Sequence, residues 1–214
     1  MTGAFTPAER RLIRAVRTPT AMQRFLNRLP YNTEPPPGRA TLRSFRGVVR
    51  TGEAHCLEAA IAAAVVMEQH GYPPLVMSLE SVCELDHVVF VYRTKRGWGS
   101  VARSRDPALH GRRPVFRRLR DLAWSYFDPY IDHQACLKGY GTVDLRVLDP
   151  YDWRFSLRNV WKVEELLLNM PHRPIRPSPA RVARFRKKFK QLVAASPGAK
   201  PMYFDQSAWT ELPD

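Results

Sequence analysis

Two residues of this 214-residue chain have the types and surroundings that nucleophilic catalysis needs: Cys56 and His87. Cys56 begins an alanine-rich run in which, from Leu57 to Met67, only Glu58 is polar. A helix that is apolar on every side is a buried helix. The dipole and unpaired N–H groups of its first turn favour the nucleophilic thiolate. We therefore expect Cys56 to be reactive, and the alternative is a buried thiol that only fills the core.

A nucleophilic cysteine needs an imidazole within hydrogen-bond reach, and we expect His87 to provide it. His87 lies at the start of residues 86–92, whose β-branched and aromatic side chains are typical of a central strand. Val89 and Val91 share its face, and we expect that face to pack on the Cys56 helix. The alternative is a strand-end histidine bonded to a carbonyl. The other histidines fit less well. His55 is next to Cys56 in sequence, and neighbours on a helix do not face one another. His70 lies at the far end of the same helix, and the remaining three lie in loops: His110, His133 and His172.

A third residue should orient the imidazole, and hairpin geometry predicts Ser104 for this role. Residues 94–97 have the composition of a turn, which pairs Arg93 with Trp98. If the return strand extends over 98–104, Ser104 lies directly opposite His87, and opposed side chains point to the same face. Serine offers no charge to stabilise imidazolium. Asp106 is the next acid on that strand, but Pro107 indicates that the strand ends there.

The elements that position these residues predict an α+β fold, with helices first and then an antiparallel sheet with further helices. A capping box at Thr6 and Glu9 starts a helical region over 6–29 that Pro19 divides in two. We expect strands at 75–79, 86–92, 98–104 and 143–148. Further helices are expected at 56–70, 112–126, 159–170 and 178–195. One domain should span 1–170, and a basic helical extension should span 171–214 after a proline-rich linker.

These motifs resemble the transglutaminase-like superfamily, which has a papain-like fold and a Cys-His-Asp triad. The resemblance covers about residues 31–106. It also extends to an uncharacterised bacterial group within the superfamily, through Ala54-His55-Cys56-Leu57-Glu58, Pro74-Leu75, Asp86-His87-Val88, Trp98-Gly99-Ser100 and Ser125-Tyr126-Phe127. It implies that Cys56 is the nucleophile and His87 the base. The chain departs from the family near 102–104, where no acid stands at the expected place of the triad aspartate.

Charge and cysteine content limit the partners and the compartment. The 34 Lys and Arg outnumber the 20 Asp and Glu, for a net charge of +14. Eight positive charges between Arg173 and Lys190 are uninterrupted by any acid, so Arg181–Lys190 could contact nucleic acid or an acidic partner. The more common alternative is a solvated helix face. The chain has three cysteines but no CxxC pair, and it has no secretory h-region. It also contains no apolar run that could span a membrane. These features indicate a cytoplasmic protein.

The sequence predicts no metal and no cofactor, because paired ligand spacings are absent even though Cys83 lies close to His87. The leading functional prediction is cysteine-dependent acyl transfer or hydrolysis of an amide or ester, with a protein or peptide-like substrate. The backbone N–H of Cys56 would be one oxyanion donor. The alternative is an inactive transglutaminase-like binding or scaffold protein that acts through its basic surface.

Overall fold

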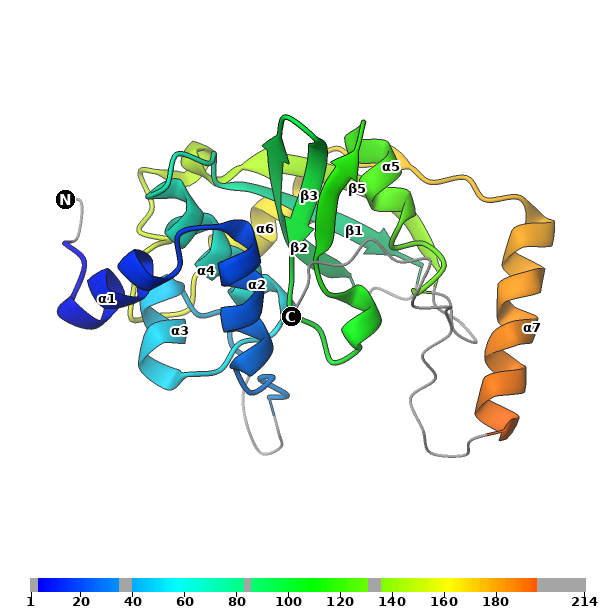
Figure 1. Ribbon diagram of the computed structural model, residues 1–214, viewed down its shortest axis with the longest axis horizontal. Coiled ribbons are helices and arrows are strands. Elements are labelled where there is room, and N and C mark those ends of the chain that lie inside the picture. The colour runs from blue at the N-terminus through cyan, green and yellow to red at the C-terminus, as the bar shows by residue number, and fades with distance from the viewer. Residues whose placement is uncertain (1–3, 35–39, 83–85, 131–135, 196–214) are drawn as a thin grey trace.

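The described part of the chain forms one antiparallel sheet of six strands, which lies at the centre of the molecule (Figure 1). The computed structural model describes residues 4–34, 40–82, 86–130 and 136–195. The strands lie in the order β4-β3-β2-β1-β5-β6 and comprise β1 Leu75–Ser81, β2 His87–Thr94, β3 Gly97–Val101, β4 Arg112–Phe116, β5 Leu137–Asp144 and β6 Arg173–Pro174. The described residues also form seven α-helices: α1 Pro7–Ala15, α2 Pro19–Arg28, α3 Phe45–Thr51, α4 Cys56–Glu68, α5 Leu119–Trp124, α6 Trp161–Asn169 and α7 Pro179–Ala195. The predicted α+β class is confirmed.

The first N-terminal helix begins where its capping residues predict, and the second begins at the proline predicted to divide the two. Thr6 and Glu9 form a complete capping box at α1. Thr18 caps α2 and Pro19 occupies its first turn, so the chain is divided into two helices as expected. The short helix α3 was not predicted, although the Ser44 side chain caps it by accepting a hydrogen bond from the Gly47 N–H.

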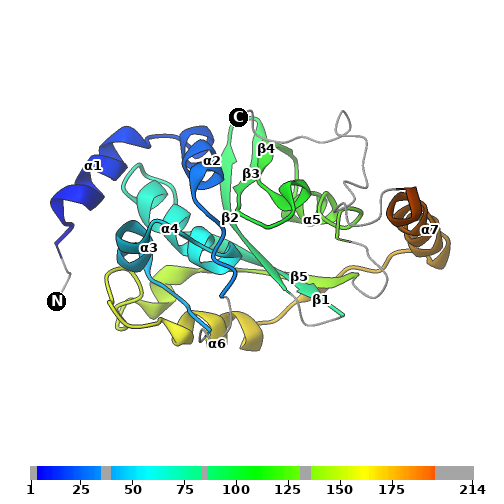
Figure 2. The ribbon, with the colours of Figure 1, turned by 90° about the horizontal axis from the view of Figure 1, so that it is seen from below.

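Two apolar cores lie on the two faces of the sheet. On one face α4, whose residues 57–67 are all buried, packs on Val88, Phe90 and Tyr92 of β2. On the other face Val89 and Val91 pack with α5. Figure 2 shows α1–α4 and α6 on one side of the sheet and α5 on the other. The predicted buried helix is therefore present, and it is held against the central strand.

The predicted β2–β3 register is confirmed, because Arg93 pairs with Trp98 and Phe90 with Val101. The predicted length of the return strand is wrong, since β3 ends at Val101. Gln23 of α2 explains this early end. Its buried side-chain amide donates to the Ala102 carbonyl at 2.7 Å and accepts from the Ala102 N–H at 2.9 Å. A side chain thus satisfies the backbone groups that a neighbouring strand would otherwise pair.

Two further predicted elements are corrected. Residues 112–116 are not helical but form β4, which lies at the edge of the sheet, where a proline such as Pro114 is tolerated. The predicted strand over 143–148 lies too late in the chain. Its first two residues end β5, and Leu145–Leu148 forms a 3₁₀ turn that Asp144 caps. Helical spacing of apolar residues cannot distinguish a short edge strand followed by a helix from one longer helix.

The basic C-terminal segment contacts the same sheet and core. Strand β6 pairs with β5, and Ile175, which follows it, is buried in the α5 core. In α7, Phe185 is buried in that core, and Arg181 forms an ion pair with Asp128 with a 2.8 Å hydrogen bond. The expected division at residue 171 stays a prediction, and β6 places the last described strand of the sheet beyond it. None of the helices described is long and apolar enough to cross a membrane.

Candidate active site

A cleft of about 640 Å³ opens where α4 and β2 begin, and Cys56 and His87 both line it. Residues on the chain before α4 form one wall, the turn after β3 forms another, and α6 contributes apolar side chains. The lining residues used below are Tyr31, Asn32, Thr41, His55, Ser104, Asp106, Leu109, Trp161 and Leu168. Trp161 and Leu168 are exposed large apolar residues. The cleft therefore offers a nucleophile, a base and an apolar surface for a substrate group.

The structure brings Cys56 and His87 together as predicted, but not through the expected face of β2. His87 lies opposite Leu79, on the face that carries Val89 and packs with α5. The α4 face carries Val88 and Phe90 instead. Cys56 is the first residue of α4 and His87 the first of β2, so the pair meets at the end of the two elements and not across their middles.

A backbone carbonyl fixes the His87 ring. His87 is 3% exposed, and its Nε2 lies 2.8 Å from the carbonyl oxygen of Leu109. A carbonyl only accepts hydrogen bonds, so Nε2 carries a proton. In the neutral ring this leaves Nδ1 as the unprotonated nitrogen, available to the Cys56 sulfur. The ring is thus held in the tautomer that a general base requires.

The predicted strand pairing of Ser104 with His87 is wrong. Strand pairing ends at Val101, so Ser104 is not paired across from His87. The Ser104 hydroxyl accepts from the Asp106 N–H at 3.2 Å, and Asp106 in turn caps the short turn Pro107–Leu109. Both residues line the cleft, but the His87 Nε2–H donates instead to the carbonyl of the third residue of that turn, Leu109. The physical reason is the side chain of Gln23, which ends the ladder and lets the chain turn back.

His55 is a functional candidate that sequence reasoning set aside. It is not within the helix but is its N-cap, with extended backbone angles, so its ring can approach the next residue. Its Nε2 donates to the Thr41 carbonyl at 2.9 Å. Its Nδ1 accepts from the Leu57 N–H at 3.3 Å in the neutral ring, or donates to the Cys56 sulfur in the imidazolium. Glu58, three residues after His55, was the available capping-box signal.

These two rings decide the charge of Cys56. Burial would raise the pKa of the thiol, but hydrogen bonds from His55 and His87 and the charges of both rings lower it to about 5. Burial alone would lower the pKa of His55, but its hydrogen bond with Cys56 and the charge of Glu58 raise it to about 9. At neutral pH the site therefore holds a thiolate beside an imidazolium.

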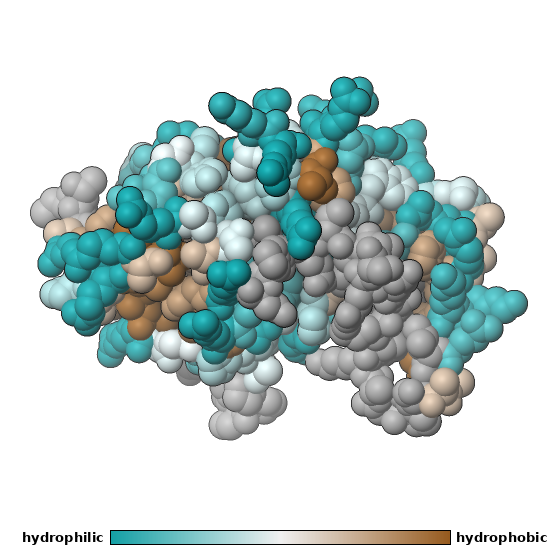
Figure 3. All heavy atoms as spheres, in the orientation of Figure 1, coloured by the Kyte–Doolittle hydropathy of each residue, from teal (hydrophilic) through white to brown (hydrophobic). Residues whose placement is uncertain are grey.

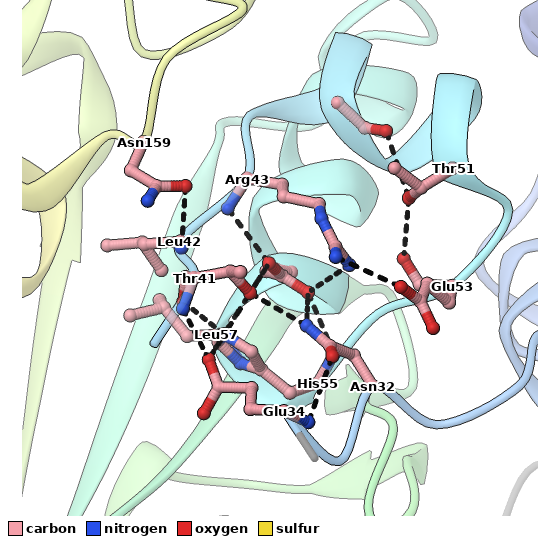
Figure 4. Close-up of polar contacts among 12 residues, drawn as sticks. Asn32, Glu34, Thr41, Leu42, Arg43, Thr51, Glu53, His55, Leu57 and Asn159 are labelled. Atoms are coloured by element: carbon pink, nitrogen blue, oxygen red, sulfur yellow. Dashed lines mark hydrogen bonds and ion pairs between the residues drawn. The ribbon is translucent and has the colours of Figure 1, made fainter. Parts of the chain in front are cut away.

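A buried carboxylate organises the chain around His55 (Figure 4). Glu58 is fully buried and accepts hydrogen bonds at 2.9–3.1 Å from the Asn32 and Thr41 side chains and from the N–H groups of Arg43 and His55. Four donors from three separate stretches of chain thus converge on one side chain. This network places Thr41, whose carbonyl binds the His55 ring, and the residues beside Tyr31. It was not predicted, because its members are far apart in sequence.

Tyr31 provides a hydroxyl at the nucleophile. Its hydroxyl lies beside the backbone N–H and the sulfur of Cys56. Burial first, and then the charge of Cys56, raise the pKa of Tyr31 to about 12 against the opposing effects of Arg105 and the Cys56 N–H. The hydroxyl therefore remains protonated at neutral pH and can donate a hydrogen bond.

Cys136 lacks such surroundings. Cys136 is buried and free, and its burial raises the pKa of its thiol. Cys83 lies outside the described residues, and so does His133. Within the described part of the chain, no three His, Cys, Asp or Glu side chains gather as a metal site requires.

The basic face predicted at Arg181–Lys190 lies on α7. Arg184, Lys187, Lys188 and Lys190 are exposed, whereas Phe185 is buried. Hydrophilic side chains line the outer right-hand edge in Figure 3, where Figure 1 places α7. The helix thus has an apolar inner edge and a cationic outer face.

Comparison of the sequence with models of known protein families and with curated proteins gave no match.

Proposed function

We propose that this protein is a cysteine-dependent acyltransferase or hydrolase that acts on an amide or ester, with Cys56 as the nucleophile and His87 as the base. The observation that carries the proposal is the pairing of Cys56 with an imidazole whose tautomer a carbonyl fixes. A thiolate in contact with a proton carrier, at the edge of an open cleft, is what covalent catalysis requires. A peptide-like substrate is favoured by the apolar wall around Trp161.

The chemistry follows from the positions of these groups. The Cys56 thiolate attacks the substrate carbonyl carbon, a C–S bond forms and the carbonyl π electrons move to its oxygen. The Cys56 N–H and the Tyr31 hydroxyl are the donors for this oxyanion. His87 takes the Cys56 thiol proton as the attacking thiolate forms, and the resulting imidazolium gives that proton to the departing nitrogen or oxygen as the acyl bond breaks, which leaves a thioester. His87 then takes a proton from water or an amine, which attacks the thioester and releases Cys56.

The proposal extends to the family. A helix that begins at the nucleophilic cysteine and packs on an antiparallel sheet, with the base at the start of the central strand, is consistent with a transglutaminase-like, papain-like core. The Leu109 carbonyl takes the place of the triad aspartate in this interpretation. A neutral carbonyl stabilises imidazolium less than a carboxylate does, since charge-assisted hydrogen bonds are about twice as strong. The nearby His55 supplies charge to the thiolate instead.

The test is direct detection of the acyl-enzyme. The full-length protein is mixed with p-nitrophenyl acetate, and intact mass and peptide mapping follow the product. We expect a burst of p-nitrophenolate and one acetyl group on Cys56. Cys56→Ala should abolish both, and the matched variant Cys136→Ala should retain both. Acetylation distributed over lysines, with no burst, would count against the proposal.

A second candidate function rests on the cationic outer face of α7. Four exposed Lys and Arg side chains on one helix favour binding to a polyanion, such as nucleic acid or an acidic protein surface. In that case the cleft would be an inactive remnant of the fold. The two functions are separable, because the acyl-enzyme test does not involve α7.

A further inference from the structure

We infer that Arg112 is a positioning residue for the Cys56–His87 pair, because its guanidinium fixes the turn whose Leu109 carbonyl orients the His87 ring. This role rests on the proposed function. Arg112 opens β4 and is only 1% exposed, which is unusual for an arginine. A buried guanidinium is costly unless its donors are used. Here they are bound to backbone oxygens of the turn that holds His87.

The hydrogen bonds of Arg112 bracket Leu109. Its Nη2 donates to the carbonyl of Ala108 at 2.8 Å, and its Nη1 donates to that of His110 at 2.7 Å. The carbonyl of Leu109, between them, accepts from His87 at 2.8 Å. Arg112 thus holds the peptide groups before and after Leu109. These bonds restrain the backbone on both sides of the Leu109 carbonyl.

Tyr126 closes the arrangement from the other side. Its hydroxyl donates to the His110 carbonyl at 2.9 Å, and its ring centre lies 5.9 Å from that of His87. The Arg112 guanidinium lies over the same ring, 4.1 Å from its centre. Ser100 joins both residues, because its hydroxyl lies 2.7 Å from the Tyr126 hydroxyl and accepts from the Arg112 N–H at 3.0 Å. The turn is therefore held by a connected polar network.

Arginine is required by this geometry. A guanidinium presents five N–H donors in a rigid plane and can bind two carbonyls at once, whereas an ammonium is a point charge on a flexible stem. The Arg112 Nε also donates to the hydroxyl of Ser125, just after α5, at 3.2 Å. The guanidinium is therefore held by hydrogen bonds at its Nε as well as at its two Nη atoms. Lysine at this position would keep the charge but could not hold both carbonyls that flank Leu109.

The experiment compares Arg112→Lys with Arg117→Lys, an exposed arginine five residues further on that serves as the matched control. NMR detects the His87 Nε2–H proton, and alkylation by iodoacetamide gives the apparent pKa of Cys56. We expect Arg112→Lys to lose the Nε2–H signal and to reduce Cys56 alkylation at about pH 5 by roughly fivefold, which is the fall in thiolate at that pH when the pKa of Cys56 rises by one unit. Arg117→Lys should change neither.

A second variant covers the case in which Arg112→Lys does not fold. Tyr126→Phe keeps the ring and removes the hydroxyl with its bonds to His110 and Ser100, and it should weaken the Nε2–H signal and slow alkylation in the same direction. If Arg112→Lys folds and keeps the wild-type Nε2–H signal and alkylation profile, the role of Arg112 is overturned. If Arg112→Lys does not fold, a Tyr126→Phe protein with the wild-type signal and alkylation profile overturns it. Neither readout needs turnover. The wild-type protein could fail to be acylated while the variant still loses the Nε2–H signal and is alkylated more slowly. That result would refute the proposed function and leave the positioning role of Arg112 standing.

Discussion

The Nε2 atom of His87 lies 2.8 Å from the carbonyl oxygen of Leu109, a residue 22 positions further along the chain. This contact decides which ring nitrogen carries the proton and so which one can serve as a base for Cys56. A side-chain acid is not needed for that purpose. The carbonyl carries no net charge, and beside Cys56 the charge of Glu58 helps to raise the pKa of the His55 ring.

The pH dependence of Cys56 alkylation tests the thiolate. Its pKa of about 5 predicts a rate near its maximum at neutral pH that falls as pH drops through about 5. His55→Gln and His87→Gln should each move the midpoint upward, because each ring stabilises the thiolate, while the matched control His172→Gln should not. Time courses with iodoacetamide and mass mapping measure this. A wild-type midpoint at the ordinary value of a free thiol would contradict the expected thiolate.

Tyr31→Phe tests the oxyanion donor. Loss of the hydroxyl should slow acetylation of Cys56 by p-nitrophenyl acetate about a hundredfold, the usual effect of removing one such donor. Alkylation by iodoacetamide forms no oxyanion, so its rate should stay close to that of wild type. Equal losses in both reactions would mean that Tyr31 acts on the thiolate itself.

Glu58→Gln tests the buried network. The amide would place an NH₂ group against the donors that now bind the carboxylate, so the free energy of unfolding should fall by roughly 3–5 kcal/mol. Glu165→Gln on the exposed face of α6 is the control and should change it by less than about 0.5 kcal/mol. Urea titrations followed by tryptophan fluorescence measure both. A small effect at Glu58 would show that the surrounding chain is held by other contacts.

The lowered pKa of His110 predicts that the free energy of unfolding falls in acid. Burial, and then the charges of Arg103, His87 and Arg112, lower the pKa of His110 to about 4 against the opposing hydrogen bond to Ser104. The unfolded chain takes up a proton near pH 6.5 and the folded one does not, so stability is lost as pH falls from about 6.5 to about 4. The loss should be on the order of 3 kcal/mol. His110→Gln should flatten this part of the profile, and an unchanged slope would assign the acid sensitivity to other groups.

Two truncations test the role of α7. A chain that ends at Ser178 keeps β6 and Ile175, so it should fold, retain Cys56 labelling and bind heparin more weakly than the whole protein. A chain that ends at Met170 loses a strand and a buried core residue and should be markedly less stable. Equal stability of the two chains would place the domain boundary at residue 171 after all. Unchanged heparin binding would exclude α7 as the polyanion surface.

The sequence was sufficient for the elements that carry strong local patterns. The apolar run after Cys56 predicted a buried helix, and the β-branched segment from His87, with its four-residue turn, predicted the hairpin and its register. The meeting of Cys56 with His87 followed from these two elements even though the face was assigned wrongly. Both residues lie at element ends, where a side chain can reach past the edge of the sheet.

The rest depended on partners distant in sequence. Gln23 ends β3 from 79 residues away, and nothing near Ser104 signals that. Strand β4 is short, contains a proline and precedes a helix, so the apolar spacing of 115–126 resembled one helix. Some contacts in the site are made by backbone atoms, such as the Leu109 carbonyl. Every residue has the same backbone carbonyl, so the amino-acid type at that position does not indicate the contact.

Because the acceptor for His87 is a main-chain carbonyl, the positions at which a substitution abolishes activity differ from those of a triad with a side-chain acceptor. Every amino acid carries a carbonyl, so an apolar substitution at position 109 leaves the partner of His87 in place. A catalytic triad that ends in an aspartate can lose its third member through one nucleotide change. In this protein a saturation screen for lost activity should spare apolar substitutions at position 109, which is buried, and should instead recover Gln23 and Arg112, residues whose side chains shape that turn.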